Sequence, residues 1–263
     1  MSGGTNGTSE VTFGVSEDLG SGLKAMASST LCFNQFFGQD DKSSCGGPVK
    51  GVKAQDTDAK GPIGTYNSYV GLAGEFGSVK IGQQFSNTFF ASALGDTFGR
   101  AAVSNNLVGT NLAAQVGNSL NYTSPSMAGA SVSYQTTLDQ TTGITSFTSW
   151  SVNYSAGAFS GAYASSKTGT NTENVVAASY DFGMAKVSVG QSTYTNAKSA
   201  VGYGVSVPFG AMLFGLGMSS QDTTDATQFG VTYGLSKRTS VYAAQGQKTG
   251  TPNTTLLGVR HNF

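Results

Sequence analysis

The sequence has no apolar run long enough to cross a membrane as a helix, which would need about 18 consecutive apolar residues. Charge is equally scarce, because only 11% of the residues are charged and the 14 basic side chains balance the 14 acidic ones. A chain without a basic excess offers no electrostatic footprint for nucleic acid or for anionic lipid. These two absences exclude a helical membrane protein and give no support for a nucleic-acid partner.

Histidine is nearly absent, and this bears on catalysis and on metal binding. The one histidine, His261, lies among the final residues, whereas a Ser/His/Asp hydrolase needs an imidazole within hydrogen-bond reach of its serine. No histidine or third cysteine accompanies the two cysteines, which argues against zinc. The stretch "GQDDK" at residues 38–42 leaves calcium open, although adjacent carboxylates in a loop are usually solvated. We therefore expect neither an enzyme nor a resident cofactor or metal.

The two cysteines, Cys32 and Cys45, flank one polar segment, "CFNQFFGQDDKSSC". A pair so close in sequence is typical of a disulfide in an oxidising compartment. Closing such a loop contributes about 3 kcal/mol in the chain-entropy treatment. Two free thiols are the alternative, and we expect the disulfide.

Proline is scarce, with 5 residues, whereas glycine is abundant, with 37. This composition argues against a helical bundle and against a disordered chain. The chain instead alternates large apolar residues with small or polar ones, as in the final stretch "TTLLGVRHNF", where Leu257, Val259 and His261 share one face. The alternation predicts about 15 strands, near residues 9–15, 22–32, 65–73, 78–85, 117–124, 129–137, 146–156, 157–166, 173–182, 184–194, 199–208, 210–220, 225–236, 239–248 and 253–263.

The connections between these strands also alternate in length. Short turns such as "EDLGSG" and "DFGM" are interleaved with longer polar connections, around residues 33–64, 86–116, 138–145, 167–172, 195–199, 221–225 and 249–253. Strands of roughly ten residues with one apolar face, short turns at one end and long loops at the other predict an all-β outer-membrane barrel. Lipid cannot satisfy open sheet edges, so the sheet must close, and at this strand number its lumen holds water. A soluble β-sandwich is the alternative, but its apolar faces would point inward against each other.

Several stretches resemble the trimeric general porins of Gram-negative outer membranes, in the form common among beta-proteobacteria. They are "SEDLGSGLKA", "YVGLAGEFGSVKIGQQ", "NSLNYTSPSMAGASVSYQ", "GLSKRTSVYAA" and the "GVRHNF" ending, in the family's order across nearly the whole chain. The resemblance implies a 16-stranded antiparallel barrel in the outer-membrane lipid, a homotrimer through which small solutes diffuse. It also implies that the last strand, ending at Phe263, is read by the barrel-assembly machinery.

The resemblance assigns roles to two loops within a single domain of residues 1–263. Residues 86–116 correspond to the constriction loop that folds into the lumen, and a polar loop of this length is unusual unless it is functional. Residues 33–64 correspond to the loop that latches onto a neighbouring subunit, with the Cys32 and Cys45 pair bracing its base. Gln83 falls where the family often has an interface-facing arginine. A solvated external loop is the alternative for each segment.

The start of the chain departs from the family pattern. The "SED" match aligns residues 9–18 with the family's second strand, so the usual first strand has no counterpart. Fifteen antiparallel strands cannot close without one parallel pairing, so either such a pairing exists or an upstream strand is missing; we favour the missing strand. The opening "MSGGTNGTSE" also lacks the basic start and apolar stretch of a signal peptide.

The narrowest part of the pore departs from the family as well. There the family sets arginines on the barrel wall against carboxylates on the constriction loop. The wall positions that alternation matches to these arginines are not basic: Glu10, Tyr66 and Asn121. The constriction loop carries a nearly balanced pair, Asp96 and Arg100, and further inward-facing lysines are expected nearer the turn ends, at Lys24, Lys80 and Lys186.

Charges at the narrowest point of a pore set its ion preference, because low-dielectric walls focus the field there. Without the arginines, we expect a weakly selective or mildly cation-preferring channel for small hydrophilic solutes. In the alternative, the neighbouring lysines or the absent strand restore a positive wall. A structural or adhesive barrel without an open pore is the rival function.

Overall fold

A computed structural model describes residues 9–33, 63–98, 107–109, 112–138 and 146–262, with only the backbone at residues 9–10, 32–33 and 63–66. Its regular structure is a 15-stranded antiparallel sheet and one short helix, α1 (Asn87–Leu94). No helix in this part of the chain is both long and apolar enough to cross a membrane. The expected all-β fold with 15 readable strands is confirmed.

The strands follow the predicted ranges closely and pair in the order of the sequence. They are β1 (Ser9–Gly20), β2 (Leu23–Phe33), β3 (Ile63–Gly74), β4 (Gly77–Phe85), β5 (Gln115–Thr123), β6 (Ala130–Thr137), β7 (Phe147–Ala156), β8 (Phe159–Thr168), β9 (Asn171–Asp181), β10 (Lys186–Tyr194), β11 (Ala200–Phe209), β12 (Met212–Gln221), β13 (Thr224–Gly234), β14 (Thr239–Lys248) and β15 (Thr254–His261).

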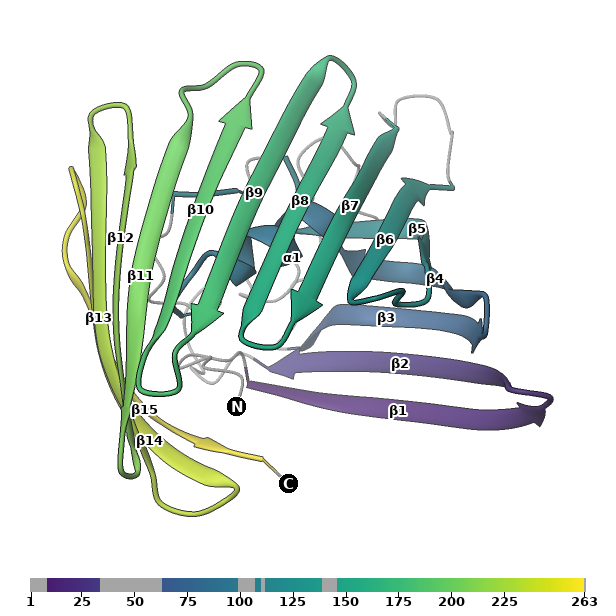
Figure 1. The fold of residues 1–263 in the computed structure, drawn as a ribbon, viewed down its shortest axis with the longest axis horizontal. Coiled ribbons are helices and arrows are strands. Elements are labelled where there is room, and N and C mark those ends of the chain that lie inside the picture. Colours follow the sequence, from purple (N-terminus) through teal and green to yellow (C-terminus); the bar gives the residue numbers. More distant parts are fainter. Residues whose placement is uncertain (1–8, 34–62, 99–106, 110–111, 139–145, 263) are drawn as a thin grey trace.

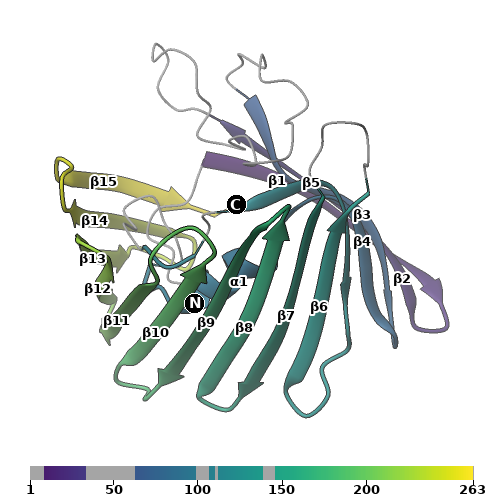
Figure 2. The same ribbon diagram turned by 90° about the horizontal axis from the view of Figure 1, so that it is seen from above.

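The sheet curves strongly, so that α1 lies on its concave side (Figures 1 and 2). β1 and β15 are its two outermost strands, and within the described residues no backbone pairing joins them. Every neighbouring pair is antiparallel, from β1–β2 to β14–β15. The way in which the sheet closes therefore stays a prediction.

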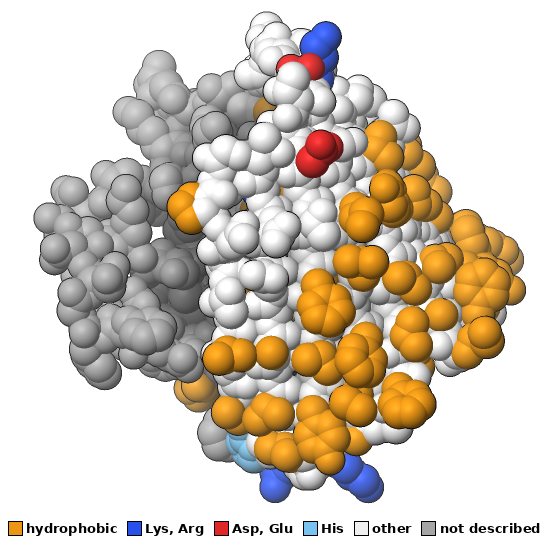
Figure 3. All heavy atoms as spheres, turned by 90° about the vertical axis from the view of Figure 1, so that its left-hand side faces the viewer, with side chains coloured by type: hydrophobic (Ala, Val, Ile, Leu, Met, Phe, Trp, Pro, Cys, Tyr) orange, Lys and Arg blue, Asp and Glu red, His pale blue; other side chains and the backbone are white. Residues whose placement is uncertain are grey.

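The two faces of the sheet have inverted polarity. Large apolar side chains are exposed on the convex face, including Phe13 at 61% and Phe229 at 52% of full exposure. Figure 3 shows such side chains spread widely over the side of the molecule formed by the late strands. Polar side chains such as Ser149, Ser166 and Gln135 are buried on the concave face. This arrangement is the opposite of a soluble β-sandwich and excludes that alternative.

Two of the connections expected to be long are tight hairpin turns. Only residues 169–170 join β8 to β9, and only residues 222–223 join β12 to β13. Gly169 has a φ of 58° and Asp222 a φ of 53°. This left-handed conformation lets a two-residue turn match the twist of the flanking strands.

A register irregularity in β3 changes which of its residues share a face of the sheet. Between Ser29 and Leu31 the pairing of β2 with β3 shifts, so that Tyr66 and its neighbour both lie opposite the single residue Thr30. Ser68 pairs with Ser29 and lies on the convex face with Val70, so the alternation that predicted Tyr66 on the inner wall does not run unbroken along this strand. A bulge breaks simple alternation, and it leaves no sequence signal here.

Candidate functional site

The segment after β4 turns onto the concave face and is tied at its base. Ser86 caps α1, because its Oγ accepts a hydrogen bond from the Phe89 N–H at 3.2 Å. The same hydroxyl donates to the Ala113 carbonyl at 2.7 Å, and the Ser86 N–H donates to the Ala114 carbonyl at 2.9 Å. The two ends of the segment are therefore held together where it leaves and rejoins the sheet.

The α1 helix packs against the inner face of β6–β10. The Thr88 and Ser166 hydroxyl oxygens lie 2.8 Å apart, and Ser166 donates onward to Ser149 Oγ at 2.9 Å. Ala91 belongs to a small apolar cluster with Ala164 on β8 and Val175 on β9. The helix was not expected from the sequence, where alternation dominates, although Ser86 before an eight-residue segment is a recognisable N-cap signal.

Beyond α1, Asp96 is held against the far wall. It is 7% exposed, and its Oδ1 accepts hydrogen bonds from Gln228 Nε2 on β13 at 2.7 Å and from the Phe98 N–H at 3.0 Å. The carboxylate of Asp96, which was expected in the constriction, is thus buried against the wall. It still places an acidic group on the inner face of the sheet.

Thr97 and Phe98 pack against small residues on the inner faces of β11–β14. Phe98 is 1% exposed and packs with Ala244 and Leu256. Gly215 pairs directly with Gly230, and Gly230 pairs with Ala244, so three adjacent strands present small residues at one level. A Cβ atom on either glycine would lie 2.9 Å from the Phe98 ring, which is too close for an ordinary contact. Glycine is therefore required here by close approach.

The returning part of the segment is fixed by side chains of the inner wall. The Leu107 N–H donates to Ser219 Oγ at 3.1 Å, and the Gly109 N–H donates to Tyr194 Oη at 2.9 Å. The Leu112 N–H donates to Glu173 Oε2 at 3.1 Å, and Glu173 is fully buried. The sequence did not predict the roles of Gly215, Gly230, Tyr194 and Glu173. Alternation places each of these residues on the inner face of its strand, but the sequence does not show which segment it contacts.

The structure brings one pair of the predicted lumen residues together. Asn121 and Lys80 are directly paired on the inner faces of β5 and β4. Lys80 Nζ lies 4.7 Å from the ring centroid of Tyr69, a cation–π contact. Glu10 and Tyr66 are described only in their backbone, and Arg100 lies outside the described residues.

The two remaining lysines that were predicted to face the lumen each pair with an acidic residue on the neighbouring strand. Lys24 pairs directly with Asp18 between β2 and β1, and Lys186 pairs directly with Asp181 between β10 and β9. Both pairs lie next to short turns, at the same end of the sheet.

The other predicted residues lie on the outer face or outside the described part of the chain. Gln83 pairs with Ser68 on the convex face and donates to Gln115 Oε1 at 3.1 Å. The Cys32 side chain, Cys45, Phe263 and the loop at 34–62 are not among the described residues, so the disulfide, the latching loop and the assembly signal stay predictions. Within the described residues, no three His, Cys, Asp or Glu side chains group as a metal site.

Comparisons with known proteins agree with this geometry. A family model described as Gram-negative porin matches residues 1–253. No curated protein sequence matches the chain. The anion-selective porin of Comamonas acidovorans is similar in structure, with a TM-score of 0.72 at 20% identity, covering 99% of this chain and 90% of that one.

Two further solved structures have the same fold. A mutant of the Rh. blastica porin has a TM-score of 0.73 at 15% identity, covering 97% of this chain and 89% of that one. The OmpF of Salmonella typhi, in complex with daunomycin, has a TM-score of 0.72 at 14% identity over the same shares. With the family match over nearly the whole sequence, these findings show that the chain belongs to the Gram-negative porin family and is a channel-forming β-barrel of the outer membrane.

Proposed function

We propose that the protein is a weakly selective or mildly cation-preferring channel for passive diffusion of small hydrophilic solutes and ions. One observation carries this proposal: the inner wall beside Asp96 and Phe98 is built from neutral residues. Gly215, Gly230 and Ala244 pair in one row across β12–β14, Gly204 of β11 lies against Thr97, and Gln228 contacts Asp96. Because Thr97 and Phe98 cover this patch, it adds no charge to the lumen, and the charged group that the segment holds beside it is the carboxylate of Asp96, which does not concentrate anions.

The two lysines that pair with aspartates, Lys24 and Lys186, support the same proposal. A lysine directly opposite an aspartate on one face of a sheet forms a nearly neutral pair, whose field is screened within about 10 Å at moderate salt. Lys24 with Asp18 and Lys186 with Asp181 are such pairs. They therefore do not restore the positive wall that the family's arginines would supply. Lys80 differs, because its direct cross-strand partners are Gly71 and Asn121.

The balance of the remaining charges sets the sign of the preference. Asp96 brings a carboxylate to the inner face, and Glu10 and Arg100 add one charge of each sign if they line the lumen. The Comamonas acidovorans relative is described as anion-selective. That similarity makes anion selectivity the main competing outcome.

Reversal potentials across a planar bilayer with a KCl gradient test this proposal. We expect a small value for the unaltered protein, a shift toward anions in Asp96→Asn and a shift toward cations in Lys80→Gln. The double variant Asp18→Asn/Lys24→Gln is the matched control, because it removes one charge of each sign and should change little. A strongly anion-selective value that persists in Arg100→Ala would refute the proposal. An absence of any conductance would instead favour a structural or adhesive barrel.

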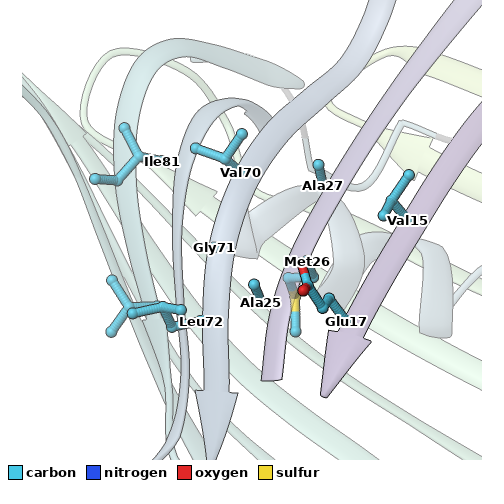
Figure 4. Close-up of a pocket in the computed structure, with 10 residues that line it drawn as sticks. Val15, Glu17, Ala25, Met26, Ala27, Val70, Gly71, Leu72 and Ile81 are labelled. Atoms are coloured by element: carbon cyan, nitrogen blue, oxygen red, sulfur yellow. The ribbon is translucent and has the colours of Figure 1, made fainter. Parts of the chain in front are cut away.

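We also propose that the channel is a homotrimer whose subunits meet on the convex face of β1–β4. That face carries an open groove of about 530 Å³, which is lined by the small residues Ala25 and Ala27 of β2, by Val15 of β1 and by Val70 and Leu72 of β3 (Figure 4). Small side chains beside larger ones let a second surface approach closely. Gln83 lies on the same face, and the loop at 33–64 would latch onto the neighbouring subunit.

A further inference from the structure

A second cavity, of about 290 Å³, lies inside the barrel between α1 and the inner faces of β6–β8. Phe90 and Leu94 of α1 line one side of it. The opposite side includes Ser131, Asn153, Ser155 and Ser160, which sit near the short turns that join β5 to β6 and β7 to β8. The cavity is lined by neutral residues.

The apolar side of the cavity presents a fixed aromatic ring. Phe90 is 56% exposed although it lies on the concave side of the sheet, where the other surfaces are mainly polar. Its ring meets Phe85 and Phe89 edge to face, with centroids 5.8 and 5.9 Å apart, and those two rings stack at 4.3 Å. Neighbouring rings therefore limit the motion of Phe90, so that a ligand would lose little entropy in ordering it.

The polar side of the cavity has spare hydrogen-bonding capacity. Asn153 Nδ2 donates to Ser151 Oγ at 3.0 Å, a bond that leaves the amide oxygen of Asn153 as an acceptor. The hydroxyl oxygens of Ser155 and Ser160 lie 3.2 Å apart, and a single shared hydrogen bond leaves each of them further sites. These groups can donate hydrogen bonds to the hydroxyl groups of a ligand or accept hydrogen bonds from them, but they supply no charge.

We propose that this cavity is a subsite for a neutral, hydroxylated ring of monosaccharide size. The face of a pyranose ring carries C–H groups that pack on an aromatic ring, while its edge carries hydroxyl groups. Phe90 and Leu94 match the face, and Asn153, Ser155 and Ser160 match the edge. A volume near the lower end of ligand pockets limits the occupant to about one ring. The subsite deepens the proposed function, because solutes would reach it through the lumen.

Glucose is the probe, and binding and conduction are measured separately. Saturation-transfer NMR on the protein in detergent micelles should detect glucose binding. Single-channel currents in KCl should fall saturably as glucose is added. Removing one aromatic contact in Phe90→Ala should raise the half-saturating glucose concentration about tenfold. Asn153→Ala should also raise it, and Phe182→Ala, which removes an exposed ring outside the cavity, should leave it unchanged.

Mannitol, which has the hydroxyl groups but no ring, should bind more weakly than glucose. The subsite is refuted if glucose gives no saturation transfer, or if its effect is the same in Phe90→Ala and Asn153→Ala as in the unaltered protein. Normal KCl conductance together with that result would leave the channel proposal standing. Saturable glucose binding to a protein that conducts no ions would refute the channel proposal and support the subsite.

Discussion

The contact of Phe98 with Gly215 and Gly230 gives the sharpest test of how the segment after β4 is held. In Gly215→Val, the new Cβ would lie 2.9 Å from Phe98 Cζ and 3.2 Å from Thr97 Cγ2. The two added methyl groups would extend into the same space. On the other side the ring already fits closely over Gly230 and beside Ala244, so a small displacement cannot make room.

The magnitude follows from what the ring loses. Overpacking a filled site costs about 1–3 kcal/mol. Releasing Phe98 into the lumen costs about 1.5–3 kcal/mol in lost burial. The two responses are alternatives and the cheaper one sets the loss, so we expect about 1–3 kcal/mol, which corresponds to an apparent melting temperature lower by roughly 3–10 °C for a chain of this size.

Circular dichroism at a fixed scan rate measures the apparent melting temperature, and planar-bilayer recordings measure open-channel noise. Noise should rise in Gly215→Val, because the segment is no longer pinned to β12–β14. Gly14→Val is the matched control: Gly14 is also on an inner face, and a Cβ atom added there would have no atom of another residue within 4 Å, its chain neighbours aside. This control should melt within about 2 °C of the unaltered protein.

A double-mutant cycle separates the ring contact from an effect on the strand itself. In a Phe98→Ala background the clash is gone, so Gly215→Val should cost little and should partly fill the space that the ring vacates. Equal destabilisation by Gly215→Val in both backgrounds would show that the strand, not the Phe98 contact, accounts for the loss.

Three further predictions concern the rest of the chain. Thiol titration of the denatured, unreduced protein should find no free thiol if Cys32 and Cys45 are bonded, and two titrated thiols would disprove the disulfide. Trp150, the single tryptophan, is 43% exposed on the convex face of β7, so lipids brominated on their acyl chains should quench its fluorescence strongly, whereas aqueous iodide should not; the reverse pattern would place that face in water. Mass measurement in mild detergent should give a trimer, and replacing Ala27 with Trp in the groove should weaken it; a monomer at every concentration would contradict the proposed assembly.

The strands could be predicted from the sequence because their pattern is local. Alternation of large apolar with small or polar residues has the same period as the strand, so Phe229, Val231 and Tyr233 reveal their common face without knowledge of the partner strands. The inverted polarity of the sheet follows from the same pattern. Local pattern failed where the backbone conformation changed, as at the irregularity in β3 and the tight turns at 169–170 and 222–223.

The sequence by itself thus determined an antiparallel sheet with an apolar outer face and a polar inner face, and through its family resemblance a channel. Only the tertiary structure decided how the segment after β4 is held. Asp96 meets Gln228, which is 132 residues later, and Phe98 rests on glycines from different strands. The reason is physical: such contacts depend on the curvature that brings distant strands to one lumen, and a glycine that makes room for a ring looks the same in sequence as a glycine that faces open space.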